Sequence, residues 1–303
     1  MTLYMILKDR DDKLIRIYFL ICDYFNELQY YCERFSNNKQ PEFTDQEIMT
    51  IYLYVMQHEG HTKIKHIHRF ASEYLRSWFP KLGSYQAFNH RLNRLAGAFN
   101  RLAEILLTSN VPDDCILEHS LLDSMPIITC SGKRSGKVAP EVTDKGYCST
   151  KGMYYHGMKL HMLGFRREGK LPHPEEILFT PASVNDITVY KQAWSTIENR
   201  TFFGDKIYMD HDLNQQMIIK QNSEMYAPVK GIKGMPDIIK RRLKAADDLF
   251  SVAVSRVRQP IEAIFNWLIE KVDIQKASKV RSTKGLMIHT FGRLTAAFIT
   301  LVI

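Results

Sequence analysis

The sequence predicts an α/β protein in which a mixed five-stranded sheet flanked by helices follows an all-helical N-terminal region. Residues 1–110 place apolar side chains at helical spacing, whereas from about residue 112 short β-type runs alternate with turns and helices. The chain has 303 residues, of which 45% are hydrophobic, so it is long enough to bury a core in two such regions. We therefore expect a helical domain over residues 1–110 and an α/β domain over residues 111–303.

Two helix starts are visible in the N-terminal region. Thr44 and Glu47 form a capping box ahead of an apolar run that begins at Ile48. Ser84 begins another helix, whose apolar face consists of Phe88, Leu92 and Leu95. The polar residues of this helix fall mostly on other faces and include Gln86, Asn89, Arg91 and Arg94. Such groups read base edges or bind phosphates, which favours a helix-turn-helix DNA-binding function, but a solvated polar face explains the pattern equally well.

The second region alternates strands and helices. Strands are expected at residues 115–126, 154–165, 176–180, 200–205 and 225–229, the first of them stopped by Pro126. Residues 131–152 are rich in Ser, Gly, Lys and Thr and are typical of an exposed loop. Helices are expected at residues 186–198 and at about 254–271.

The charge balance favours a polyanionic partner. The chain carries 41 basic and 33 acidic residues, a formal charge of +8, and neutralising phosphates releases counterions. One basic stretch contains Lys230, Lys233, Lys240, Arg241, Arg242 and Lys244. Charge alone suits a basic soluble protein of any kind equally well.

Neither a disulfide framework nor a membrane span is indicated. The five cysteines include no close Cys-x-x-Cys pair, so a reducing, cytoplasmic setting is expected. The apolar runs at residues 14–25 and 294–303 are interrupted by charge or shorter than the about 20 residues that a transmembrane helix needs.

Three carboxylates stand where burial makes a charge costly. Asp123 ends one apolar run, and Asp205 follows the apolar residues of another. Glu262 lies at the edge of the apolar stripe of its helix, one turn after Arg258. Carboxylate oxygens are the ligands that Mg²⁺ prefers, and two such ions support phosphodiester transfer. Taken singly, each aspartate is also explained as a capping or turn residue, and Arg258 with Glu262 as an ordinary helix ion pair.

Several motifs in order resemble the DDE transposases of bacterial insertion sequences, which have an RNase H-like catalytic core. They are Leu122-Asp123-Ser124-Met125-Pro126, then Gly146-Tyr147-Cys148 with the segment from Tyr154 to His161, Thr180-Pro181-Ala182-Ser183-Val184-Asn185-Asp186, Gly204-Asp205-Lys206-Ile207-Tyr208, and the helix from Arg258 through Glu262. The resemblance extends from about Asp45 to Ile303.

The resemblance implies an RNase H-like fold and a set of site residues. It makes Asp123, Asp205 and Glu262 the catalytic, metal-binding triad for two Mg²⁺ ions, for which Mn²⁺ substitutes. Arg258 would then lie near the DNA end, and Lys159 and His161, on one strand face, are expected to contact phosphate. Asp186 is expected to cap a helix instead.

Two positions depart from the related sequences. These often have a tyrosine three residues before the arginine and a lysine seven after the glutamate, where this chain has Ser255 and Ile269, with Lys271 two residues further on as a DNA contact. The resemblance therefore leaves open whether a hairpin forms at the DNA ends.

The expected function is DNA transposition. The partners implied are the terminal inverted repeats of the element and target DNA, bound by a homodimer or larger assembly. Two alternatives stay open, namely a nuclease or resolvase with the same core but without strand transfer, and an inactivated DNA-binding relic.

Overall fold

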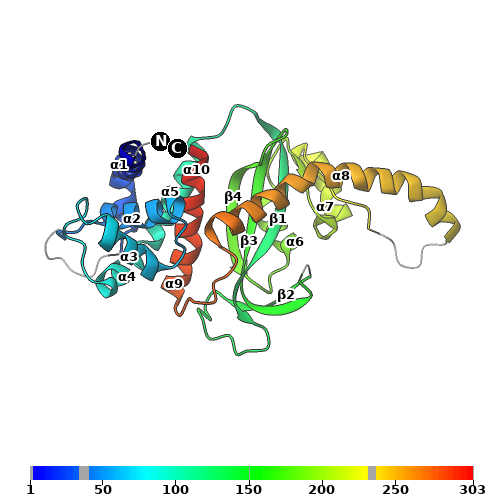
Figure 1. Ribbon diagram of the computed structural model, residues 1–303. Coiled ribbons are helices and arrows are strands. Elements are labelled where there is room, and N and C mark those ends of the chain that lie inside the picture. The colour runs from blue at the N-terminus through cyan, green and yellow to red at the C-terminus, as the bar shows by residue number, and fades with distance from the viewer. Residues whose placement is uncertain (1–2, 34–40, 150, 231–236, 303) are drawn as a thin grey trace. The chain divides into compact units, whose positions relative to one another are not determined.

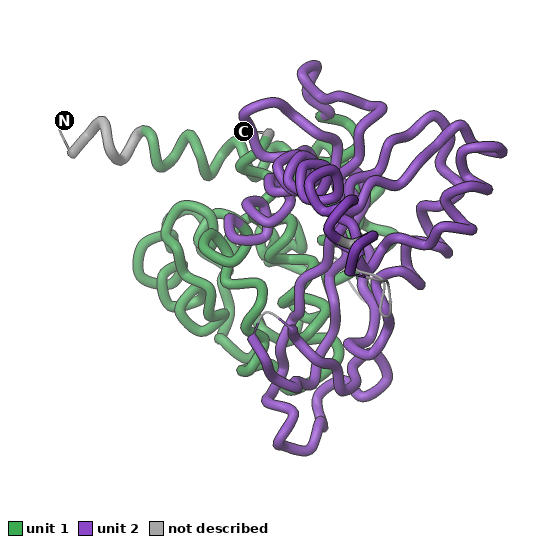
Figure 2. The backbone as a smooth tube through the Cα atoms, turned by 90° about the vertical axis from the view of Figure 1, so that its right-hand side faces the viewer, with its two compact units in different colours: residues 1–110, 268–303 green, residues 111–267 purple. Residues whose placement is uncertain are grey.

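The computed structural model describes residues 3–33, 41–149, 151–230 and 237–302. The chain forms two compact units, unit 1 with residues 1–110 and 268–303 and unit 2 with residues 111–267 (Figure 2). Residues 268–303 thus belong to the same compact unit as residues 1–110. Lys233 of the basic stretch lies outside the described residues.

Unit 1 is helical. Its helices are α1 (Leu3–Leu28), α2 (Asp45–His58), α3 (Ile64–Tyr74), α4 (Tyr85–Leu92), α5 (Ala96–Ser109), α9 (Thr283–Met287) and α10 (Arg293–Val302) (Figure 1). The predicted capping box of Thr44 and Glu47 is confirmed at α2, and Ser84 caps α4 as predicted. α10 packs against α2 and α5 because its residues are apolar on nearly every side, with Leu294 and Phe298 buried.

Unit 2 is built on a mixed sheet. The strands are β1 (Cys115–Ser131), β2 (Asp144–Cys148), β3 (Met153–Arg167), β4 (His173–Pro181), β5 (Thr201–Phe203) and β6 (Glu224–Tyr226). Their order is β2-β3-β1-β5-β6, with β4 beside β2 on the same edge of β3. β1 is antiparallel to β3 and parallel to β5, which is parallel to β6. The predicted mixed five-stranded sheet is confirmed, with one short strand in addition, and is consistent with an RNase H-like fold.

Two local predictions in this sheet were wrong. Pro126 does not stop β1, because β5 accompanies that strand only through Leu121 and Pro126 lies beyond it, where a missing N–H breaks no ladder to β5. Residues 131–152 are not all loop, since β2 lies among them. A Cβ at Gly146 would lie 2.4 Å from the carbonyl oxygen of Ala182. The glycine weakens the strand pattern in the sequence, but it allows the backbone at Ala182 to pack closely against β2.

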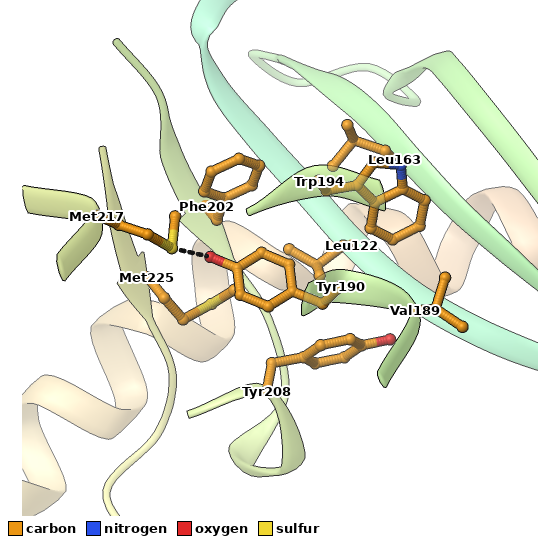
Figure 3. Close-up of a cluster of buried hydrophobic side chains, with 9 residues drawn as sticks. All are labelled: Leu122, Leu163, Val189, Tyr190, Trp194, Phe202, Tyr208, Met217 and Met225. Carbon is orange, nitrogen blue, oxygen red and sulfur yellow. Dashed lines mark hydrogen bonds between the residues drawn. The ribbon is translucent and has the colours of Figure 1, made fainter. Parts of the chain in front are cut away.

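Helices and a buried aromatic cluster cover the sheet of unit 2. The helices are α6 (Asp186–Val189), α7 (His211–Gln221) and α8 (Asp237–Val272). α6 continues as a wider helical turn to Trp194. α8 begins 17 residues before the expected start at Val254. Figure 3 shows Tyr190 at the centre of this cluster, between Phe202 and Tyr208, with its hydroxyl 3.1 Å from the sulfur of Met217. The end of β5 is therefore fixed by close aromatic packing.

No helix in the described part of the chain is long and apolar enough to cross a membrane.

Candidate active site

Strand register brings two of the predicted carboxylates together. β1 and β5 run parallel, with Leu121 opposite Phe203. Asp123 lies two residues after Leu121, within β1, and Asp205 lies two residues after Phe203, just past the end of β5. The charge of Asp205 acts on Asp123, so the two carboxylates are close to one another. A Cβ at Gly204 would lie 2.9 Å from the ring of Tyr208, so glycine allows the chain to turn tightly after β5. Asp205 also accepts a hydrogen bond from the Lys206 amide, which is the capping role foreseen as its alternative.

Helix α8 adds Arg258 and Glu262. The predicted apolar stripe is confirmed, since Ile261, Ile264, Phe265, Leu268 and Val272 are all buried. With that face inward, Arg258 donates from Nη1 to Asp123 Oδ2 at 2.8 Å and from Nη2 to Glu262 Oε1 at 2.5 Å. Its own Nε is buried and has no hydrogen-bond partner among the described residues. One guanidinium thus links a strand carboxylate and a helix carboxylate that are 139 positions apart in the chain, 262 against 123.

The electrostatics of the site reflect crowded negative charge. The pKa of Asp123 is raised to about 6, mainly by burial and in part by the charges of Asp186 and Asp205, against the lowering effects of Arg258 and the Ser124 amide. Burial would lower the pKa of Arg258, but Asp123, Glu262 and Asp205 raise it above its ordinary value. All three predicted carboxylates therefore act on this one arginine.

Asp186 is a further member of the site. It is the first residue of α6 and not its N-cap, which is Asn185, so the predicted capping role was wrong. Its Oδ1 instead accepts hydrogen bonds from Ser124 Oγ and from Lys159 Nζ, each at 3.0 Å. Asp186 thus ties the turn after β4 to β1 and β3, beside Asp123.

Lys159 and His161 hold this arrangement from within the sheet. Lys159 Nζ also donates to the carbonyl oxygen of Val184 at 2.8 Å. His161 is fully buried, and its Nε2 lies 2.8 Å from Thr180 Oγ1. Burial lowers the pKa of His161 to about 4. In this structure Lys159 is bonded to protein acceptors and His161 exposes no surface, so the phosphate contacts expected of them stay a prediction.

Tyr208 lies beside the carboxylates of the site, a role that the sequence did not predict for it. Its hydroxyl is buried without a hydrogen-bond partner among the described residues. Burial raises its pKa well above the ordinary value, and Asp186, Asp123 and Asp205 raise it further, so the hydroxyl is near all three carboxylates. Asp186 comes five residues after the end of β4, in the motif that runs from Thr180 to Asp186, and that motif was the only sequence signal for it. Tyr208 offered no signal beyond its place in the second aspartate motif.

The donor set suits divalent cations, although their site is not assembled. Within the described ranges, no group of three or more His, Cys, Asp or Glu side chains is arranged to hold a metal ion. Arg258 occupies oxygens of Asp123 and Glu262 instead. The clustered carboxylates that raise the pKa of Asp123 nevertheless form a hard, negatively charged donor set, and a divalent cation would relieve this repulsion.

The predicted DNA-contacting residues outside unit 2 differ in how exposed they are and in whether they bond to other residues. On α4, Gln86 is exposed and Asn89 partly exposed. Arg91 donates to the carbonyl oxygen of Phe43 and pairs with Asp45, so it holds α4 to the start of α2. Arg94 lies 3.1 Å from His90 through Nη2. Lys271 is exposed in the last turn of α8 and belongs to unit 1.

Comparison with known proteins identifies the family. No curated protein and no solved structure matched the chain. One family model, described as the transposase DDE domain, matches residues 116–299. The match begins at Ile116, includes β1, β5 and α8, and covers more than half of the chain. The protein therefore belongs to the family of transposases with a DDE domain.

Proposed function

We propose that the chain is the DNA transposase of a bacterial insertion sequence and that Asp123, Asp205 and Glu262 are its catalytic carboxylates. Water attacks a phosphodiester at each element end and breaks the bond to the 3′ oxygen, which leaves as a 3′ hydroxyl. That hydroxyl then attacks a phosphodiester of target DNA, whose own 3′ oxygen leaves. The observation that carries this proposal is the convergence of the three carboxylates on Arg258 in a member of this family.

The family generally uses divalent metal ions, and in this chain the three carboxylates would hold two Mg²⁺ or Mn²⁺ ions. Bound there, the ions would activate the attacking oxygen and stabilise the leaving one. The role of Arg258 is to hold Glu262 close to Asp123, whose charges would otherwise repel one another. Asp186 accepts a hydrogen bond from Ser124 and so holds β1 at the residue next to Asp123. DNA would also contact unit 1 through Gln86 and its neighbours on α4, and pairing two element ends requires at least a dimer.

Strand cleavage of a labelled duplex that carries the element's terminal repeat tests the proposal. Asp123→Asn, Asp205→Asn and Glu262→Gln should each reduce cleavage with Mg²⁺ or Mn²⁺ by at least about 100-fold, because each removes a charged metal ligand. Glu270→Gln is the matched control, since Glu270 is an exposed glutamate of the same helix. Wild-type cleavage by Asp123→Asn or Asp205→Asn would refute the assignment.

The same assay separates the alternatives. Adding a target plasmid and finding cut but never joined products would favour a nuclease or resolvase. Sequence-specific binding by the wild type without any metal-dependent cleavage would favour an inactivated relic.

A further inference from the structure

The N-terminal part of α8 is an amphipathic helix without a partner. We call residues Asp237–Ala253 the α8 arm; it extends beyond the sheet of unit 2 (Figure 1). None of its described side chains is buried, and burial begins at Val254. The C-terminal end of the arm is anchored by two contacts. The Val229 amide donates to Ser251 Oγ at 3.0 Å, and the ring of Tyr226 packs against the ring of Phe250.

The arm repeats the pattern that buries the rest of the helix. The core stripe of α8 continues into the arm at the same spacing through Phe250, Ala246, Leu243 and Ile239. A second apolar row lies beside it, namely Ile238, Leu249 and Val252. Ile238 is 83% exposed and Leu249 73% exposed. Soluble proteins rarely leave such a continuous apolar surface open unless another molecule covers it.

The sequence of the arm is complementary to itself in the antiparallel sense. Reversal about the midpoint between Lys244 and Ala245 exchanges Ile239 with Phe250 and Leu243 with Ala246, so the apolar stripe maps onto itself. The same reversal exchanges Arg241 with Asp248 and Arg242 with Asp247. Two arms packed antiparallel would therefore align apolar with apolar residues and place the basic half of each against the acidic half of the other.

We propose that the α8 arm is a dimerisation element whose partner is the arm of a second copy of this chain. A two-fold interface is self-complementary by necessity, which is the property that the arm sequence has. The proposal deepens the proposed function, on which it rests for its purpose, because a dimer brings two active sites to two element ends.

Sedimentation of the full chain without DNA or metal tests the apolar part of this interface. Leu243→Asp should raise the dissociation constant of the dimer at least about tenfold, because each of the two arms carries the change at the centre of the contact. Ile219→Asp is the control, since Ile219 is an equally apolar residue, 83% exposed, on α7. Circular dichroism should be unchanged for both.

Charge reversal tests the direction of packing. Asp247→Arg with Asp248→Arg should weaken the dimer, as should Arg241→Asp with Arg242→Asp, because each pair of changes sets like charges opposite one another. All four changes together restore complementarity and should restore the dimer, at unchanged net charge. A parallel arrangement would not be rescued in this way.

A wild type that stays monomeric, a dimer unaffected by Leu243→Asp, or a fourfold variant that is not rescued would each overturn the proposal. Loss of DNA affinity in the Arg241 and Arg242 variant with an unchanged oligomeric state would mean that the arm binds DNA instead. Failure of the catalytic assignment is distinguishable, because in that case Asp123→Asn would cleave DNA while the dimer and its rescue remained.

Discussion

A buried arginine in unit 1, Arg293, and a partly buried one in unit 2, Arg258, are stabilised in opposite ways. Arg258 in unit 2 is held by the carboxylates of Asp123 and Glu262 and keeps one nitrogen unbonded. Arg293 in unit 1 is held by backbone carbonyls, those of Val272, Asp273 and Thr62. Burial lowers the pKa of Arg293, whereas carboxylates keep that of Arg258 above its ordinary value. A cation on fixed carbonyls serves the fold, while a cation on carboxylates occupies groups that another ligand can claim.

The comparison predicts the largest change in stability at Arg293. Replacing it by Met leaves three carbonyls without their charged donor, so Arg293→Met should lower the free energy of unfolding by about 3 kcal/mol. Urea denaturation measures this. Arg281→Met is the control, because Arg281 bonds two carbonyls at an exposed position and its loss should change stability by less than about 0.5 kcal/mol.

Arg258 should show the reverse pattern. Arg258→Met should reduce strand cleavage about 100-fold, through loss of a preorganised cation at the site. Its effect on unfolding should stay within about 1 kcal/mol, because without Arg258 the pKa of Asp123 rises and the carboxyl takes up a proton instead of remaining an unpaired charge. The exposed Arg256→Met is the control. A large loss of stability with normal cleavage would erase the distinction between the two arginines.

Asp186→Asn sharpens the comparison within unit 2. The change leaves Lys159 without its counter-charge and loosens the link to Ser124, so cleavage should fall about tenfold. Asp212→Asn, an exposed aspartate of α7, should have no effect. Unchanged cleavage would show that Asp186 only supports the fold.

His289 extends the comparison to pH. Burial and the charge of Arg293 lower its pKa to about 3, so between pH 6.5 and 3 the unfolded chain binds the proton and the folded chain does not. Its contribution to stability is complete above pH 6.5 and falls by about 1.4 kcal/mol for each pH unit below it. In urea denaturation at pH 7, 6 and 5, His289→Gln should lose this dependence. Equal slopes for both proteins would contradict it.

The smallest effect is expected at Gln86, an exposed polar residue of α4. Gln86→Ala should weaken binding to element-end DNA by about 1 kcal/mol without changing stability. Gln216→Ala, on exposed α7, is the control for electrophoretic mobility shifts. No change in affinity would favour the solvated polar face that the sequence left as an alternative.

Local rules predicted much of the fold and of the site, and tertiary pairing decided the rest. The capping box at Thr44 and the apolar stripe through Ile261 follow from short-range patterns, and the structure confirms both. Pro126 was misjudged because its tolerance depends on where β5 ends, which the sequence of β1 does not contain. Asp186 was misjudged because its partners, Ser124 and Lys159, come from two other strands.

The most direct test of whether the three carboxylates share ions is to measure Mn²⁺ binding to the full chain in complex with an element-end duplex. Electron paramagnetic resonance measures the binding, because it detects the Mn²⁺ that remains free. The wild type and Glu270→Gln should bind equally. Asp123→Asn and Asp205→Asn should each weaken binding at least about tenfold, because the two carboxylates lie close to one another and serve one site. Unchanged Mn²⁺ affinity in both variants would contradict the account.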